Sequence, residues 1–102
     1  MKAATVSFRE SAIEDLQSIY DHIAEDNGPV RADRYIEKIT AHCMKLSLFP
    51  NRGRASDDIS PGLRILPFEG RVTIVYRIDD AGVRIVRVFY AGRDYADEEF
   101  PE

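Results

Sequence analysis

The spacing of hydrophobic positions changes along the first quarter of the chain, and the change predicts a strand followed by a helix. Residues 4–8 are β-branched and aromatic enough for a short strand. Apolar residues then recur at three- and four-residue intervals, which is typical of an amphipathic helix. They are Ile13, Leu16, Ile19, Tyr20 and Ile23. Two capping boxes, Ser7 with Glu10 and Ser11 with Glu14, both fit the start of this helix, so its first turn stays open.

A second helix is expected directly after the first. Asn27, Gly28 and Pro29 end the first helix, because glycine accepts the left-handed C-terminal conformation and proline suits the first turn of the next helix. The second helix is predicted over residues 30–48, and the polar, turn-rich residues 51–61 after it predict a loop. Its apolar stripe is Ala32, Tyr35, Ile36, Ile39, Cys43 and Leu46. The connection is so short that the two helices form an antiparallel hairpin.

The second half of the chain predicts three strands. Residues 63–66 form a short strand that Pro67 is expected to stop, and residues 71–78 alternate strictly. One face of the alternating strand carries Val72, Ile74, Tyr76 and Ile78, and the other carries Arg71, Thr73, Val75 and Arg77. After a tight turn, residues 83–90 are almost wholly β-branched or aromatic.

These elements predict an α+β fold with two layers in the order β-α-α-β-β-β. The N-terminal helical hairpin packs on a small antiparallel sheet, and the first strand joins one edge of that sheet. The other sheet face carries arginines and is expected to be either exposed to solvent or a surface for a partner. We expect one domain over residues 1–95 and an acidic C-terminal tail over residues 96–102.

Length and composition narrow the class of protein. The 102 residues, 44% of them hydrophobic, allow one domain with one thin core. No apolar run approaches the ~20 residues that span a bilayer, and no signal-like segment stands at the N-terminus, so no membrane association is expected. Cys43 has no cysteine to pair with, which favours a reducing compartment. The expectation is a small cytoplasmic protein.

Charge is distributed unevenly. The net charge of −4 argues against direct binding of nucleic acid by the chain alone. Residues 52–95 nevertheless carry 8 cations, all arginine, against 6 acids, whereas residues 96–102 carry 4 acids and no cation. Arginine presents a planar fork of donors that suits carboxylates and phosphates. The arginine cluster is therefore the feature of the sequence most indicative of a functional surface.

Most catalytic and cofactor motifs are absent from the sequence. His22 and His42 stand alone on separate helices without the spacing of metal ligands, and Cys43 belongs to an apolar stripe. The glycines are isolated at turns, so no phosphate-binding loop is present. We expect no cofactor and no metal.

Cleavage of RNA is the one reaction that the arginines favour. Arginines with aromatic neighbours can stabilise a phosphorane-like transition state, but the reaction also needs a proton acceptor and a proton donor. The predicted sheet has neither lysine nor histidine. Arginine is a poor proton shuttle, so Tyr90, Tyr95 or a carboxylate would have to serve.

The chain resembles the RelE/ParE superfamily of toxins from bacterial type II toxin–antitoxin modules. The resemblance rests on the element order and on five short patterns. They are SAIEDL at 11–16, LFPNRGR at 48–54, GLR at 62–64, VYR at 75–77 and VRVFYAGRD at 86–94. Together they cover nearly the whole chain in the order typical of the superfamily.

Within the superfamily the chain is most similar to the ParE branch. RelE-type members cut mRNA on the ribosome with lysines and arginines of the sheet and a C-terminal tyrosine. The resemblance places those positions on Arg64, Leu66, Thr73, Arg93 and Glu99. Only two of the five keep a positive charge, which disfavours RNA cleavage. A ribonuclease would need a rearranged set made of Arg64, Arg93, Tyr90 and Tyr95.

The ParE resemblance implies a non-enzymatic toxin that inhibits growth by binding DNA gyrase and is neutralised by a ParD-like antitoxin. An exposed strand edge and the groove of the helical hairpin suit such a partner. Tyr20, Ile23, Tyr35 and Ile39 are expected near that groove, although Ile23 and Ile39 also suit packing on the sheet. The arginines expected to face acidic residues of the antitoxin are Arg64, Arg71, Arg77, Arg87 and Arg93. The alternatives are a RelE-like ribonuclease and a degenerate module that only binds its antitoxin.

Overall fold

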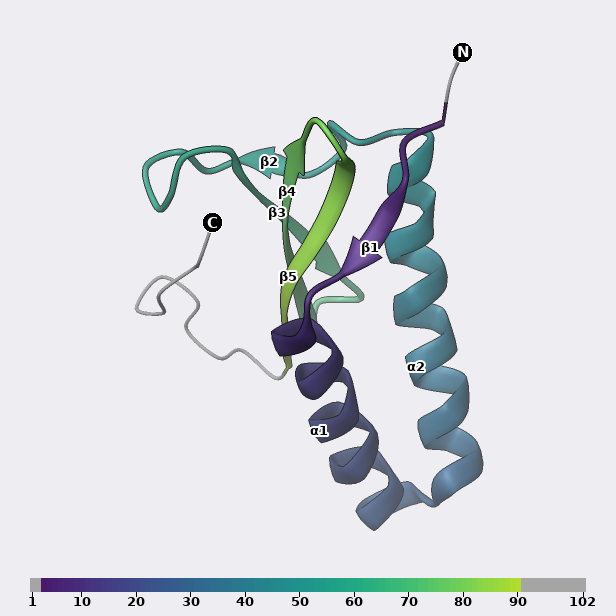
Figure 1. Ribbon diagram of the computed structural model, residues 1–102. Helices are drawn as coiled ribbons and strands as arrows, with labels where there is room; N and C mark the ends of the chain where they lie inside the picture. Colours follow the sequence, from purple (N-terminus) through teal and green to yellow (C-terminus); the bar gives the residue numbers. More distant parts are fainter. Residues whose placement is uncertain (1–2, 91–102) are drawn as a thin grey trace.

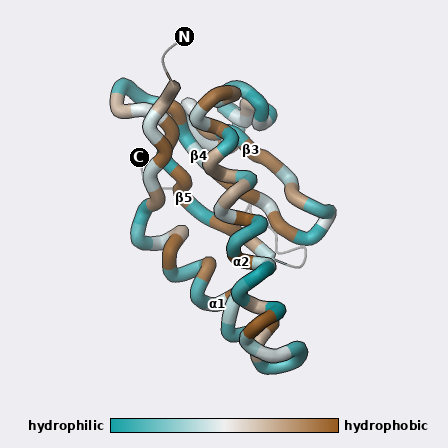
Figure 2. Tube along the Cα trace, turned by 90° about the vertical axis from the view of Figure 1, so that its right-hand side faces the viewer, coloured by the Kyte–Doolittle hydropathy of each residue, from teal (hydrophilic) through white to brown (hydrophobic). Residues whose placement is uncertain are grey.

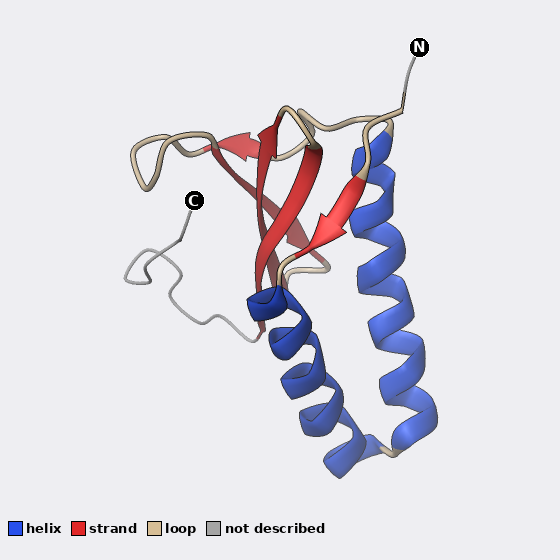
Figure 3. Cartoon of the chain, in the orientation of Figure 1, coloured by secondary structure: helices blue, strands red, loops and turns tan. Residues whose placement is uncertain are grey.

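Two antiparallel helices lie against one face of a twisted, five-stranded sheet (Figure 1). The computed structural model describes residues 3–90. The helices are α1 (Glu10–Asn27) and α2 (Pro29–Met44), the latter extended by the 3₁₀ turn η1 (Lys45–Ser47). The strands are β1 (Val6–Phe8), β2 (Arg54–Ala55), β3 (Leu63–Phe68), β4 (Val72–Asp79) and β5 (Gly82–Tyr90). The predicted α+β architecture of two layers is confirmed, with helices on one side and strands on the other (Figure 3).

The sheet is mixed, whereas the sequence predicted an antiparallel one. Its strand order is β1-β5-β4-β3-β2; β1 pairs parallel with β5, and all other neighbours pair antiparallel. The helical hairpin returns the chain to the end where β1 began, as the hydrogen bond from Ala4 N–H to the Ser47 carbonyl shows. β3, β4 and β5 then alternate in direction, so β5 runs parallel to β1. The predicted edge position of the first strand is confirmed.

Three boundaries differ from the prediction. The loop predicted at 51–61 contains β2, which pairs with β3. Pro67 lies inside β3 opposite Thr73 and does not end it. Because β2 covers only Arg64 and Ile65, β3 is an edge strand at Pro67, where a missing N–H costs no ladder bond. The second helix ends four residues early, since its last turn tightens into η1.

Neither predicted capping box starts α1. The N-cap position is Arg9, without a side-chain cap, and the Ser11 hydroxyl donates to the Val86 carbonyl at 2.7 Å. The Ser11 side chain therefore binds β5 and does not cap the helix. The predicted stop is confirmed: Gly28 has a φ of 89°, in the region open to glycine, and Pro29 opens α2.

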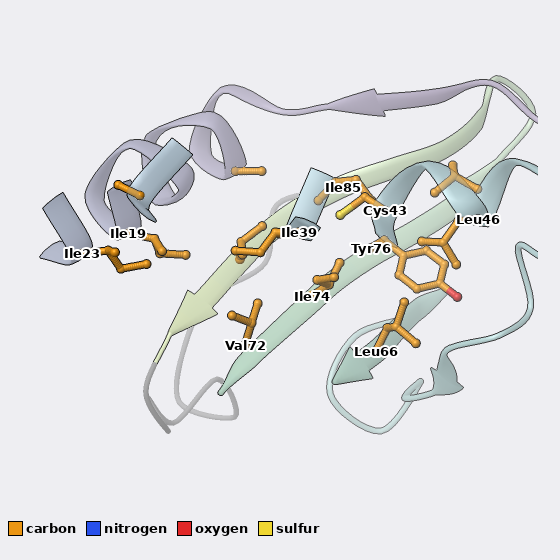
Figure 4. Packing of buried hydrophobic residues seen from close by; sticks show 14 residues of the cluster. Ile19, Ile23, Ile39, Cys43, Leu46, Leu66, Val72, Ile74, Tyr76 and Ile85 are labelled. Atoms are coloured by element: carbon orange, nitrogen blue, oxygen red, sulfur yellow. The ribbon is translucent and has the colours of Figure 1, made fainter. Parts of the chain in front are cut away.

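The main core lies between the helical hairpin and the sheet (Figure 4). α2 contributes Ile39 and Cys43 and η1 contributes Leu46, all with no exposed surface, and these pack over Ile74 and Tyr76 of β4. A shift in the β4–β5 register at Val75/Tyr76 keeps β5 residues on both sides of it turned to this core. The predicted apolar stripe of α2 is confirmed, and brown hydrophobic positions of helices and strands converge along this layer (Figure 2).

A second, smaller core covers part of the opposite sheet face. Leu63, Ile65, Val75 and Phe89 form it, with Ile59 from the preceding loop packed against it. The sequence predicted this face to be exposed or to receive a partner. That prediction is wrong for the centre of this sheet face, because the 56–62 segment folds over it. Val75 has no exposed surface, and only 8% of the surface of Arg77 is exposed.

Candidate functional site

The arginines of the far sheet face are engaged within the protein. Arg77 donates to the Pro61 carbonyl and, at 2.8 Å, to the Ser60 hydroxyl, so it fastens the 56–62 segment to β4. Arg84 lies opposite Arg77 in the register and forms an exposed ion pair with Asp79 at 3.4 Å. Arg77 thus has a structural role. The sequence did not reveal this role, because the 56–62 segment reaches Arg77 only through tertiary contacts.

Arg87 joins the sheet to α1. Its guanidinium meets the Asp15 carboxylate through two hydrogen bonds of 2.7 and 3.0 Å, and it lies 4.7 Å from the centre of the Phe89 ring. The same carboxylate accepts the Val88 N–H at 2.9 Å. Arg87 is therefore held on an internal acid, with 17% of its side chain exposed.

Arg64 shapes the loop between η1 and β2. Its guanidinium donates to the carbonyls of Gly53 at 2.6 Å and Asn51 at 3.2 Å. Behind them, the buried Tyr76 hydroxyl donates to the Pro50 carbonyl at 2.7 Å and accepts the Gly53 N–H at 2.8 Å. A Cβ at position 53 would lie 2.7 Å from the tyrosine ring, so this position requires glycine. The loop is rigidly held, and Phe49 beside it is 64% exposed.

A basic cleft opens where the tip of the helical hairpin extends past the end of the sheet. Its volume is about 400 Å³, and four cations line it: Arg31, Arg34, Lys38 and Arg71. The remaining lining residues are Ile23, Asn27, Tyr35 and Tyr90. Of the described arginines predicted to meet a partner, Arg71 alone lies here. The three helical cations were missed, although their spacing of three and four residues was a readable sign of one helix face.

Tyr35 and Tyr90 form the aromatic wall of this basic cleft. Their ring centres are 6.2 Å apart in an edge-to-face arrangement, and Phe68 lies 6.3 Å from Tyr35 on its other side. The Tyr35 hydroxyl is buried and has no hydrogen-bond partner. Burial raises the pKa of Tyr35, and Glu69 and Tyr90 add to the increase, so the phenol is a neutral donor at physiological pH.

A second groove lies on the outer side of the hairpin, between α1 and α2. It measures about 280 Å³, and its apolar lining consists of Ile13, Leu16, Tyr20 and Ile36. Tyr20 therefore lines this outer groove, whereas Tyr35 lines the basic cleft on the other side of α2. Ile23 and Ile39 are buried in the core, as the alternative prediction for them stated.

The residues predicted for a ribonuclease do not converge within the described range. Arg64 lies opposite Tyr76, and Tyr90 lies opposite Val72. Four residues along β4 and two strand spacings therefore separate Arg64 from Tyr90, a distance of about 16 Å. Arg93 and Tyr95 lie outside the described residues.

Other nucleophiles and ligands between residues 3 and 90 are placed for structure. Burial raises the pKa of the Cys43 thiol to about 12, so it is a protonated core residue. His42 packs on Phe68, and burial together with Arg52 and Lys45 lowers its pKa. The described part of the chain contains no group of three metal-ligating side chains and no helix long and apolar enough to cross a membrane.

A family model described as ParE toxin of the type II toxin–antitoxin system parDE matches residues 6–95. The match includes every helix and strand described above. The chain belongs to the ParE toxin family. It is accordingly a toxin of the type II toxin–antitoxin class, and the resemblance to the ParE branch is confirmed.

Individual relatives agree with the ParE assignment. Toxin ParE3 of Caulobacter vibrioides is 31% identical over 77 residues, which cover 72% of this chain and 73% of the relative. A solved structure of the chromosomal ParDE system from P. aeruginosa has a TM-score of 0.77 at 24% identity, covering 87% of this chain and 97% of that one. The RelBE2 toxin–antitoxin complex of Mycobacterium tuberculosis has a TM-score of 0.67 at 25% identity, covering 86% and 98%. Both solved structures thus share the fold of this chain.

Proposed function

We propose that this ParE-family toxin inhibits growth without catalysis, by binding DNA gyrase, and that a ParD-like antitoxin neutralises it. Membership of the ParE family carries the proposal. The geometry supports a binding role, because Arg77 and Arg87 are committed to internal partners and Arg64 lies about 16 Å from Tyr90.

The helical hairpin offers the surface for the antitoxin. The outer groove exposes 55% of Ile13 beside Leu16, Tyr20 and Ile36, which suits the apolar face of an amphipathic helix. The edge of β3 beyond β2 is also open, since β2 covers only two of its residues. At the other edge, β1 pairs with the first part of β5, and α1 covers the next part through Ser11 and Asp15.

Two reconstituted assays test the target and the absence of catalysis. Purified gyrase is assayed for supercoiling with and without this protein, and mRNA on translating ribosomes is analysed for cleavage. We expect inhibited supercoiling with intact message. Cleavage of the mRNA without inhibition of supercoiling would instead identify a RelE-like ribonuclease.

A growth assay separates an active toxin from a degenerate module. Expression of the chain alone is expected to arrest growth, and co-expression of the neighbouring antitoxin is expected to restore it. Normal growth on expression alone, together with a stable antitoxin complex, would leave antitoxin binding as the remaining activity.

A further inference from the structure

The two sides of α2 differ sharply in charge. Arg31, Arg34 and Lys38 face the basic cleft, whereas Asp33 and Glu37 line the outer groove on the opposite side of the helix. Residues three and four apart on a helix are close enough to pair, but here each sign keeps to its own side. The segregation produces a concentrated positive field over a small concave surface.

The side chains of the cleft cations are not paired with an acid within the described chain. Between residues 3 and 90, none of the four side chains forms a hydrogen bond or an ion pair, and no carboxylate lines the cleft. All four are exposed. Like charges held together in this way repel one another, so an anionic occupant would stabilise the arrangement.

A second observation at the same place also indicates an oxygen-bearing ligand. The Tyr35 hydroxyl has no hydrogen-bond partner, although it is shielded from water. A buried hydroxyl without a partner destabilises the protein, because it has lost its hydrogen bonds to water and gained none in return. Tyr35 lines the cleft, so an oxyanion bound there would give this donor an acceptor after a small shift of the ring.

We propose that the basic cleft binds the carboxylates of an acidic segment of the antitoxin. The inference rests on the proposed function and adds a second, electrostatic contact to the apolar outer groove. The three arginine forks match carboxylates, and Ile23, Tyr35 and Tyr90 provide apolar walls for the intervening side chains. Arg31 and Lys38 are seven residues apart, about 10 Å along α2, so the cleft offers cations to more than one carboxylate of the segment.

A peptide fits this cleft better than a nucleic acid does. The whole chain carries a net charge of −4. A long polyanion that extends beyond the cleft would therefore be repelled by the rest of the protein. A cleft of about 400 Å³ accepts a few side chains but does not form a channel that tracks a phosphate backbone.

The test measures binding of the antitoxin encoded beside this chain by titration calorimetry. The double variant Arg34→Glu/Lys38→Glu reverses two charges at exposed positions, and Lys45→Glu is the matched control outside the cleft. We expect the double variant to weaken the complex at least ~10-fold at about 50 mM NaCl, and the difference to shrink severalfold at about 500 mM. The control is expected to stay within about 2-fold of the unchanged chain, as a single exposed charge contributes little.

The other outcomes are distinguishable. Equal antitoxin affinity for the double variant and the Lys45→Glu control would overturn the assignment of the cleft while leaving the toxin–antitoxin module intact. Failure of the unchanged chain to form any complex would overturn the proposed function and this inference together. A 15-nucleotide single-stranded DNA is titrated in parallel; cleft-dependent binding of that probe with unchanged antitoxin affinity would assign the site to nucleic acid and overturn the proposal.

Discussion

A single hydroxyl holds the loop that leads from the helices into the sheet. Tyr76 is fully buried, and its oxygen bonds both the Pro50 carbonyl and the Gly53 N–H. Replacing it with phenylalanine keeps the ring but leaves these two backbone groups without a partner. We expect Tyr76→Phe to lower the free energy of unfolding by about 1–3 kcal/mol, measured by urea denaturation. A change below about 0.5 kcal/mol, the size typical of a neutral surface substitution, would show that water replaces the hydroxyl.

The buried thiol of Cys43 predicts a loss of stability in alkali. Burial raises its pKa from the ordinary 9.0 to about 12, so the native state keeps a proton that the unfolded chain loses. Stability is therefore unaffected below about pH 9 and falls as the pH rises further, by up to about 1.4 kcal/mol per pH unit. Urea denaturation between about pH 8 and 10 measures the slope; Tyr35 and Tyr76, whose ordinary pKa is 10.0, contribute mainly above that range.

The Cys43→Ala variant is the control for this slope. It is expected to be less stable at neutral pH, because it leaves a small cavity beside Ile39 and Leu46. Its stability should nevertheless stay level between about pH 8 and 10. An equal alkaline slope in both proteins would assign the effect to another group.

Among the elements, α1 is joined to β5 by a largely buried carboxylate in addition to the Ser11 hydrogen bond and apolar packing. Asp15 binds Arg87 through two hydrogen bonds and also accepts the Val88 N–H, with only 14% of its side chain exposed. Asp15→Asn leaves the guanidinium largely buried without its counter-charge. We expect a loss of about 2–4 kcal/mol in thermal or urea unfolding. The exposed neighbour Glu14→Gln is the matched control, and equal losses in the two variants would refute a specific role for Asp15.

Local signals predicted the helices well and the sheet less well. Apolar spacing and the Gly28–Pro29 connection fixed both helices and their antiparallel hairpin, since each signal acts within a few residues. The parallel pairing of β1, the short β2 and the position of Pro67 inside β3 depend on partners far along the chain. Strand register of this kind is a tertiary property, so residue patterns alone did not reveal it.

Dependence on distant partners also explains why the sequence did not predict the basic cleft. Counting arginines in the second half of the chain led to Arg77 and Arg87, which the fold uses internally. The basic cleft instead combines Arg31 and Arg34 of α2 with Arg71 at the start of β4. Residues so distant in sequence meet only because the hairpin extends past the end of the sheet (Figure 1).

At the scale of the whole molecule, the hairpin presents an apolar groove on one side of α2 and a basic cleft on the other. An antitoxin that occupies the outer groove must bury Ile13, which is 55% exposed. We expect Ile13→Glu to weaken the antitoxin complex about 10-fold, because the groove would then hold an unpaired charge against an apolar helix face. Titration calorimetry with the neighbouring antitoxin measures the change.

The contrast with Leu48→Glu makes this prediction specific to the groove. Leu48 is 61% exposed and lies beyond η1, away from the lining of both the groove and the cleft. The two substitutions change hydrophobicity and charge almost equally, so they differ mainly in position. If Leu48→Glu weakens the complex as much as Ile13→Glu does, the antitoxin covers the end of α2 instead. A second readout is growth during co-expression of the antitoxin. If the Ile13→Glu variant arrests growth under these conditions, the variant is still toxic but escapes the antitoxin. The groove is then needed for neutralisation and not for toxicity.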